Sequence, residues 1–334
     1  MYVLVGPPLT VGPITLGAQI RVDQVGDALG HAQLLPVIVL VGLVLASLLT
    51  RAARWQVFFL PSRHVPMPPL VGTLAISYMA STFLPLRAGE LVRAVFLGQR
   101  ERIPIPAVIG TILVEKLFDF LAIAGLLAML MLLVPLPGAA QVAGFSIVAV
   151  IVIGFGFITA LAIWRAPMLN LIGNIEARLP FGLGARGRIR DAAQNFAEGT
   201  DSLRVGRLWL SALAWTALTW FLGTAATWAG ALALGVQLEL APVLFWMILT
   251  NSSQAVPSSP GYVGVYHAAT TLALTAFGID PATAVGIALI THALSYASLV
   301  VAGLIALWFG GYTFSDVLKG SRSRVGVAPV SAEL

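Results

Sequence analysis

The chain has 334 residues, of which 58% are apolar and only 10% are charged, and its mean hydropathy is +0.93. A soluble domain carries about 25% charged residues, so these values exclude a water-soluble globular core. The formal net charge is +5, and the absence of cysteine excludes structural disulfides and thiolate metal sites. We therefore expect an all-α polytopic membrane protein that binds no metal and no cofactor.

Five apolar runs are long enough to cross a hydrocarbon core, which needs about 20 apolar residues. In chain order they are Leu34–Arg54, Pro104–Leu133, Val142–Trp164, Leu208–Leu234 and Thr283–Phe309. The N-terminal segment 1–33 lacks the basic region and cleavage site of a signal peptide, and three prolines interrupt its apolar part. We interpret this segment as lying outside the membrane or as a truncated helix.

Seventeen of the 19 Lys and Arg residues lie in segments that the five spans place on one side. They include Arg51, Arg54 and Arg63 after the first span and seven arginines within 165–207. Positively charged loops remain in the cytoplasm. The distribution therefore predicts a cytoplasmic (inner) cell membrane protein with an outside N-terminus and an inside C-terminus, so that 311–334 is a cytoplasmic tail.

Two further apolar stretches, 68–98 and 242–278, begin and end on the same side in this topology. Each is interrupted near its middle, by Pro85-Leu86-Arg87-Ala88-Gly89 in the first and by Pro257-Ser258-Ser259-Pro260-Gly261 in the second. Non-helical backbone at membrane depth is tolerated where it is buried in protein or lines a cavity. We predict two re-entrant helical hairpins that enter from opposite faces.

The order of spans and hairpins occurs twice in the chain. Residues 34–133 and 208–310 each contain span, hairpin and span, and 134–207 links them with a further span and a basic amphipathic segment expected to lie on anionic lipid. Three positions recur at a constant offset of 172, namely Ser81/Ser253, Pro85/Pro257 and Gly89/Gly261. Because the two halves begin on opposite sides, we predict an inverted repeat, which is a recurrent transporter design.

Ionisable side chains inside the bilayer cost at least ~2.5–3.5 kcal/mol on insertion scales, so they mark candidate functional positions. The first repeat has two such groups, Arg87, Glu90 and Arg93 at the break and Glu115, Lys116 and Asp119 in the next span. The second group lies about 20 Å from the cytoplasmic end at a rise of ~1.5 Å per residue. Arg87 could bind a phosphate with both arms of its guanidinium, and Lys116 could bind a head group. A cytosolic salt-bridge set at the break and structural ion pairs in the span remain open alternatives.

The second repeat offers mainly neutral polar groups. Its candidates are Asn251, Ser252, Gln254, Ser258, Ser259, Gly261 and Tyr262 at the break, followed by His267, His292 and Tyr296. Half-helix N-termini at a break present free N–H groups to anions. Each histidine is a candidate proton or substrate ligand, and a packing role for each stays open.

Three motifs in order resemble the lysylphosphatidylglycerol synthase transmembrane family, also called flippase-like membrane proteins. They are Pro85-Leu86-Arg87-Ala88-Gly89-Glu90-Leu91-Val92-Arg93, Glu115-Lys116-Leu117-Phe118-Asp119 and Pro260-Gly261-Tyr262-Val263-Gly264-Val265-Tyr266-His267. The resemblance implies movement of aminoacyl-phospholipids or polyprenyl-phosphate-linked sugars across the membrane. Many members carry a glutamate where His267 stands. The chain ends about 25 residues after its last predicted span, so we expect no soluble synthase domain.

We therefore predict a lipid flippase rather than an enzyme, with membrane lipids as its partners and no role for nucleic acid. Its substrate would be a lipid with an anionic or phosphate-bearing head group. One alternative is an intramembrane lipid phosphatase or glycosyltransferase, although the outer loops contain only Glu239 and Asp280 as acidic residues. Another is a non-transporting partner of a lipid-modifying enzyme.

Overall fold

The computed structural model describes residues 30, 32–60, 62–84, 88–135, 138–178, 187–254 and 259–310, together with four short segments before residue 22. These four segments are β-strands in two antiparallel pairs. β1 (Tyr2–Leu4) pairs with β4 (Gln19–Arg21), and β2 (Leu9–Val11) pairs with β3 (Ile14–Leu16). From residue 34 onward the described elements are helices.

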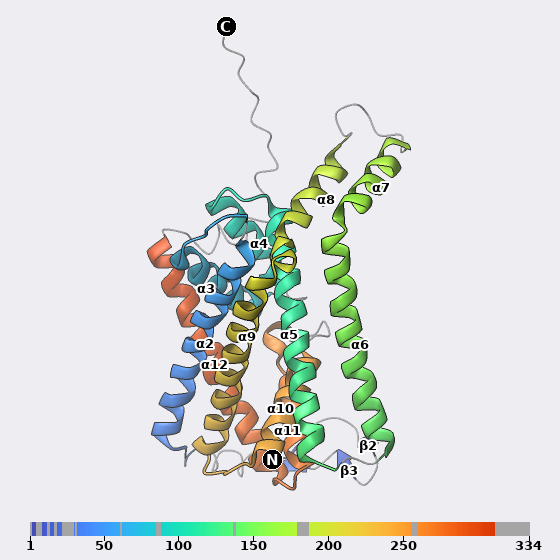
Figure 1. The fold of residues 1–334 in the computed structure, drawn as a ribbon. Coiled ribbons are helices and arrows are strands. Elements are labelled where there is room, and N and C mark those ends of the chain that lie inside the picture. The colour runs from blue at the N-terminus through green and yellow to red at the C-terminus, as the bar shows by residue number, and fades with distance from the viewer. Residues whose placement is uncertain are drawn as a thin grey trace.

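Five of these helices are long and apolar enough to cross a membrane. They are α2 (Leu34–Phe59), α5 (Ile105–Leu133), α6 (Gly138–Ile163), α9 (Gly206–Ala233) and α12 (Pro281–Gly310). The helices run alternately in opposite directions through the bundle (Figure 1). The prediction of a helical membrane protein is confirmed for the described residues of 34–310, with five helices able to cross the membrane. The four short strands before residue 22 depart from the predicted all-α chain.

Four shorter helices form two packed pairs. The first pair is α3 (Met67–Phe83) and α4 (Ala88–Arg100), and the second is α10 (Leu240–Ser253) and α11 (Val265–Thr275), preceded by the 3-10 turn η3 (Pro260–Tyr262). The first pair lies toward the end of the bundle where α2 ends, and the second lies toward the opposite end (Figure 1). The re-entrant placement of these pairs and the inverted repeat stay predictions.

Glycine permits the close approach of α3 and α4. The Ser77 hydroxyl donates to the carbonyl oxygen of Gly89 over 2.8 Å. A Cβ on Gly89 would collide with the Ser77 carbonyl oxygen and with Ser81. The glycine predicted to lie in the break therefore allows α4 to pack directly on α3.

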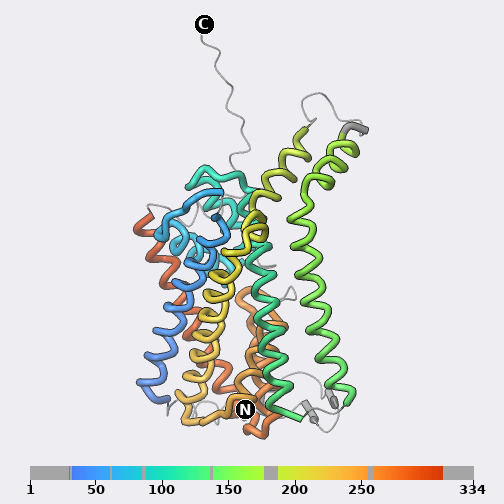
Figure 2. Tube along the Cα trace, viewed as in Figure 1, coloured from blue at the N-terminus to red at the C-terminus, as the bar shows by residue number. Residues whose placement is uncertain are grey.

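Helices that are far apart in the sequence form the main contacts of the bundle. α2 packs along α9, and α12 packs along α3 (Figure 2). α5 contacts α4 and α10, and α12 contacts α11. The largest core cluster gathers around α2, α3 and α5 and includes Trp55, Phe58 and Phe118.

The linking segment folds into α7 (Arg165–Arg178), α8 (Arg188–Gly199) and the turn η2 (Asp201–Arg204). The buried Glu176 carboxylate accepts the N–H groups of Ile189 and Arg190, each over 3.1 Å, and so caps the N-terminus of α8. α8 packs on α5, because Gly110 and Gly199 bring the two backbones together. This part of the predicted amphipathic segment is therefore held by protein contacts.

Candidate functional site

A cavity of about 320 Å³ lies inside the helical bundle. Its lining comes from α2, α3, α4 and α5 of the first half of the chain and from α9, α10, η3, α11 and α12 of the second half. Eight of the predicted candidates line it, namely Glu90, Arg93, Lys116, Asp119, Asn251, Gln254, Tyr262 and Tyr296. The structure thus brings residues from both predicted hairpins to one place.

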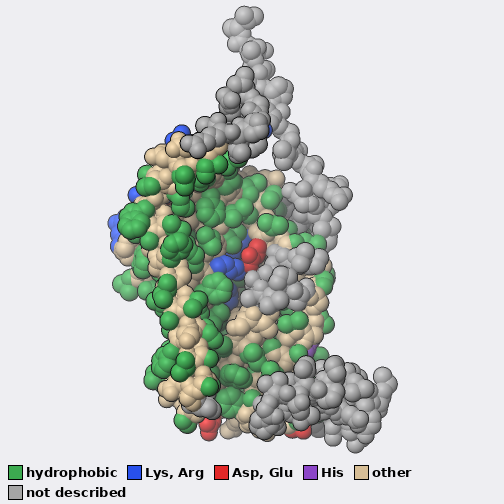
Figure 3. Space-filling view, turned by 90° about the vertical axis from the view of Figure 1, so that its right-hand side faces the viewer, with side chains coloured by type: hydrophobic (Ala, Val, Ile, Leu, Met, Phe, Trp, Pro, Cys, Tyr) green, Lys and Arg blue, Asp and Glu red, His purple; other side chains and the backbone are tan. Residues whose placement is uncertain are grey.

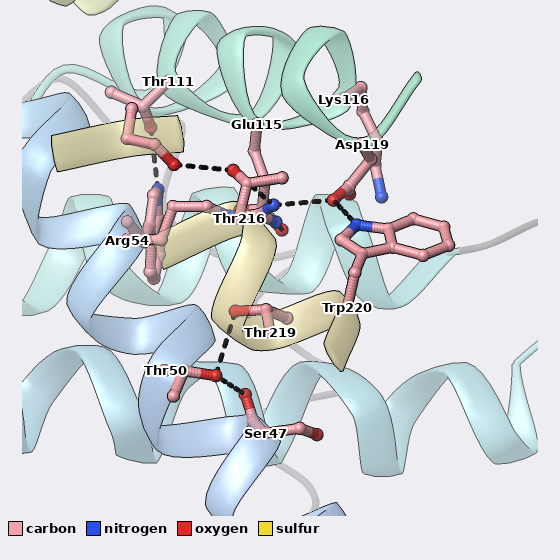
Figure 4. Close-up of polar contacts among 12 residues, drawn as sticks. Ser47, Thr50, Arg54, Thr111, Glu115, Lys116, Asp119, Thr216, Thr219 and Trp220 are labelled. Carbon is pink, nitrogen blue, oxygen red and sulfur yellow. Dashed lines mark hydrogen bonds and ion pairs between the residues drawn. The ribbon is translucent and has the colours of Figure 1, made fainter. Parts of the chain in front are cut away.

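A buried ion cluster lies beside the cavity, and Arg54 is at its centre. Arg54 is 0% exposed, and its Nη1 lies 2.7 Å from Asp119 Oδ1 while its Nη2 lies 3.3 Å from Glu115 Oε1. Trp220 from α9 donates its indole N–H to Asp119 over 3.2 Å (Figure 4). Burying charges is costly unless they are paired, so these contacts fix α2, α5 and α9 relative to each other.

Arg93 attaches α4 to the same cluster. Its guanidinium pairs with Glu115 and lies 3.6 Å from the ring centroid of Trp55, a cation–π contact. The Trp55 indole N–H in turn donates to Thr111 over 2.9 Å. Glu115 is 1% exposed and does not line the cavity. For Glu115 the structure therefore favours the alternative of a structural ion pair.

Lys116 and Glu90 form the accessible part of the site. Lys116 Nζ lies 2.8 Å from Glu90 Oε1, and the two side chains are 30% and 32% exposed. Lys116 therefore pairs across helices with Glu90 rather than with its own neighbours Glu115 and Asp119. In Figure 3, Lys or Arg and Asp or Glu side chains are visible at mid-height on one flank, framed by hydrophobic side chains.

The structure corrects the prediction that Arg51 and Arg54 are loop charges after the first span. α2 continues to Phe59, so both arginines lie within the helix, and Arg51 lines the cavity. The sequence signal for this longer helix was the apolar run that follows Arg54. Arg51 lies 6.0 Å from the Tyr78 ring centroid and has no carboxylate partner among the described residues.

The charges of the site do not cancel. The described positive side chains are Arg51, Arg54, Arg93 and Lys116, and the negative ones are Glu90, Glu115 and Asp119. Each carboxylate has at least one cationic partner. One positive charge is left in excess, and Arg51 is the cation without a carboxylate.

The side of the cavity formed by α10 and α12 carries neutral polar groups. Asn251 donates one amide N–H to the Met247 carbonyl over 2.8 Å. Gln254 donates to the Thr250 carbonyl over 3.0 Å and accepts from the Tyr296 hydroxyl over 3.3 Å. Among the predicted residues, Asn251 and Gln254 thus face the cavity with amides that are only partly used by their own helix.

His292 connects α12 to the second break. Its Nε2 lies 2.8 Å from the Gly261 carbonyl oxygen, and because a carbonyl only accepts, Nε2 carries the hydrogen. The ring also packs against His267 and Tyr296, at centroid distances of 4.8 Å and 4.3 Å. Gly261 has φ of +63°, and a Cβ there would lie 3.2 Å from the Thr82 carbonyl oxygen. The second break therefore touches α3 of the first pair.

Several predicted residues lie away from the cavity lining. Ser252 and Ser259 are exposed, and His267 accepts the Gly264 N–H through Nδ1 over 3.2 Å, which caps α11. Arg87 and Ser258 lie outside the described residues. Within the described part of the chain, no group of three or more His, Cys, Asp or Glu residues has an arrangement that could hold a metal ion.

The fold and the site together define a multi-pass membrane protein with an ion cluster and a cavity inside its helical bundle. The family described as lysylphosphatidylglycerol synthase TM region matches residues 4–303. The chain belongs to this family, as the sequence motifs predicted.

One curated relative is glycosyltransferase AglD of Haloferax volcanii, which is 28% identical over 268 aligned residues. The match covers 70% of this chain and 42% of the relative, so the chain spans less than half the length of that protein. No solved structure matches the chain.

Proposed function

We propose that the protein is a lipid transporter that moves a lipid with a phosphate-bearing head group across the membrane. The observation that carries this proposal is the excess positive charge in the cavity, contributed by Arg51. Charge interactions strengthen where water is scarce, and a guanidinium matches the geometry of a phosphate. A lipid phosphate would supply the counter-charge that the described residues lack.

The size of the cavity fits a head group and leaves the lipid tails outside. About 320 Å³ lies at the lower end of the ~300–1,000 Å³ that small-molecule sites occupy. Glu90 and Lys116 are each about a third exposed, so the cavity is not closed off from its surroundings. In this arrangement the head group enters past Glu90 and Lys116 while the tails remain in the bilayer.

The packing of the bundle supports an inverted repeat. If the two halves are equivalent, α2 corresponds to α9, α3 to α10, α4 to α11 and α5 to α12. The contact of α3 with α12 then corresponds to the contact of α10 with α5, and the structure contains both. The contact of α4 with α5 corresponds in the same way to that of α11 with α12, and both of these are present too. Repeats of this kind expose a central site alternately to the two sides, which a transporter requires.

We also propose the orientation of the protein in the membrane, which fewer loop charges support than the sequence indicated. With Arg51 and Arg54 removed from the loops, Arg63, Arg100 and Arg207 still lie where α2 and α4 end and α9 begins. These positions are at one end of the bundle (Figure 1). By the positive-inside rule, we place this end in the cytoplasm of a cell whose cytoplasmic membrane holds the protein.

An enzymatic role is the second candidate, because the relative from Haloferax volcanii is named a glycosyltransferase. Acid–base or nucleophilic chemistry needs a group that is free to take a proton or to attack. The carboxylates Glu90, Glu115 and Asp119 are all ion-paired, and neither His267 nor His292 lines the cavity. The arrangement therefore favours binding and transport over chemistry.

The test is a reconstitution in vesicles with a fluorescently labelled prenyl phosphate and a membrane-impermeant quencher. Arg51→Gln removes the excess charge, and losing a charged hydrogen bond of about 1.5–3 kcal/mol corresponds to roughly 10- to 100-fold slower transport. Arg63→Gln is the matched control, because Arg63 is exposed and lies outside the cavity lining. Equal rates for wild type and Arg51→Gln would contradict the proposal, as would no movement of label where an established flippase works. Release of phosphate or sugar by the purified protein would favour the enzyme instead.

A further inference from the structure

The second break has an unusual backbone that glycine makes possible. Gly261, Tyr262 and Gly264 all have positive φ, of +63°, +57° and +89°, a region that suits glycine and is unfavourable for tyrosine. Within the break, the Ser259 hydroxyl donates to the Val263 carbonyl over 2.5 Å. The position of the break relative to the bundle therefore depends on the hydrogen bonds that it makes with α11 and α12.

Two histidines make these hydrogen bonds in opposite roles. His292 donates from Nε2 to the Gly261 carbonyl oxygen over 2.8 Å, whereas His267 accepts the Gly264 N–H through Nδ1 over 3.2 Å. A ring N–H still donates after the ring gains a proton, so the His292 bond survives protonation. An acceptor nitrogen that gains a proton becomes a donor. The bond from Gly264 to His267 therefore exists only while the His267 ring is neutral.

His267 is also the ring that a proton reaches more readily. It is half-buried, whereas His292 is 7% exposed, and a buried charge without a partner is costly. The ring centroids lie 4.8 Å apart, so a positive charge on one ring disfavours a charge on the other. We therefore expect the pair to take up one proton, on His267.

The surroundings of His267 contain few other ionisable groups. α11 packs against α10 and α12. α10 has no ionisable side chain, α12 has His292 and Tyr296, and α11 itself has Tyr266 beside the ring. Among the described residues, no carboxylate, lysine or arginine pairs with either histidine. The charge of this region near neutral pH is therefore set by the two histidines.

We propose that His267 is a proton-operated latch, meaning a contact that holds the second break when its ring is neutral and releases it when protonated. A proton taken from water onto Nδ1 places two donors face to face. It also puts a positive charge at the positive end of the α11 dipole. The bond to Gly264 then breaks, and the His292 bond holds the break alone, so that the break moves more easily against the first helix pair.

This inference rests on the proposed function for what the latch controls, namely the rate of transport, but the movement itself can be measured without transport. The chain has no cysteine, so spin labels attach only to introduced ones. Leu91→Cys on α4 and Val263→Cys in the break provide exposed positions, at 65% and 59% exposure. The separation of the two labels is measured by electron–electron double resonance on purified protein in nanodiscs.

Lowering the pH from about 7.5 to about 5.5 covers the range in which histidine changes charge. We expect the ratio of displaced to closed molecules to rise about three- to tenfold, as the loss of one neutral hydrogen bond provides. His267→Gln should abolish this response, because glutamine at this helix position accepts the same N–H and takes no proton. A separation equal to that of the wild-type ring at pH 7.5 shows that the variant is folded. His64→Gln is the matched control, because His64 is exposed in the loop between α2 and α3.

The second measurement is the rate of lipid movement in vesicles at the same two pH values. The probe is acyl-labelled phosphatidylglycerol, whose phosphodiester keeps one negative charge throughout, so a change in rate cannot come from the probe. Transport should be about three- to tenfold faster at the lower pH in the wild type and in His64→Gln. In His267→Gln the rate should not depend on pH.

The two measurements separate the latch from the transporter. An unchanged label separation between the two pH values, or an equal response in His267→Gln and the wild type, would overturn the latch. Lipid movement at the same rate at both pH values would also overturn it. A pH-dependent separation without any lipid movement would leave the latch standing and refute the transporter.

Discussion

Glu115 offers the sharpest test of the buried ion cluster. Glu115→Gln keeps the size and shape of the side chain but removes the negative charge that Arg54 and Arg93 share. The side chains of these two arginines are 0% and 3% exposed, so water cannot replace the lost partner. Breaking a buried ion pair by removing one member costs about 3–5 kcal/mol. We expect Glu115→Gln to lower the free energy of unfolding by that amount.

Glu90→Gln is the comparison, because the chemical change is the same while Glu90 is more exposed and has one cationic partner instead of two. Glu90 and its partner Lys116 are about a third exposed, and pairs that water can reach contribute about 0.2–1 kcal/mol. The two variants should therefore differ by at least about 2 kcal/mol, roughly a 30-fold difference in the unfolding equilibrium. Equilibrium unfolding in mixed micelles, followed by tryptophan fluorescence, measures both.

A double variant distinguishes charge imbalance from general damage. Glu115→Gln combined with Arg93→Gln returns the site to the net charge of the wild type, so its loss of stability should be smaller than the sum of the two single losses by about 1–3 kcal/mol. Equal losses for Glu115→Gln and Glu90→Gln, or strict additivity in the double variant, would refute the account of the cluster given above.

Two further changes test contacts that hold the helices in place. Gly110→Ala should destabilise the protein by about 1–3 kcal/mol, because the added Cβ would collide with the Phe196 carbonyl oxygen, whereas Gly125→Ala in the same helix meets nothing within 4 Å and should not destabilise it; thermal unfolding in detergent compares the two. His292→Phe keeps an aromatic ring but loses the hydrogen bond to Gly261, so transport in vesicles should fall while the unfolding free energy changes by only about 0.5–1.5 kcal/mol. A His292→Phe variant with unchanged transport would show that this bond does not matter for function.

The sequence predicted the spans well because each is a long apolar run whose reading does not depend on neighbours. The same reasoning failed at Arg51 and Arg54. A charge normally ends a membrane span, but α2 continues past two arginines, because Arg54 pairs with the tertiary partners Glu115 and Asp119 and Arg51 lines the cavity. The sequence identified those acidic partners and Arg93 as candidates but not Arg54, the cation that both acids share.

The division of roles among the candidates also depended on tertiary structure. Glu115 and Asp119 share a helix face, as their spacing predicts, yet only Asp119 lines the cavity. Adjacent Lys116 crosses to Glu90 on α4. Periodicity places residues on a face, but it does not say which neighbouring helix covers that face, so sequence alone could not separate the buried pairs from the accessible one.

The two short helix pairs are held to the bundle by unequal contacts, which bears on how a transporter built this way would work. α4 is attached through Arg93, whose buried ion pair and stacking on Trp55 are of the kind that cost several kcal/mol to break. The second break is attached to α12 by the neutral hydrogen bond between His292 and Gly261, a contact of about 1 kcal/mol. α10 and α11 themselves have further contacts, namely the hydrogen bonds of Gln254 with Tyr296 and of Tyr266 with Thr291 and a core cluster shared with α9 and α12. If the cavity opens to alternate sides, we therefore expect the break at Gly261 to move against a fixed α4. His292→Phe therefore perturbs the element that we expect to move, whereas Glu115→Gln perturbs the frame against which it moves.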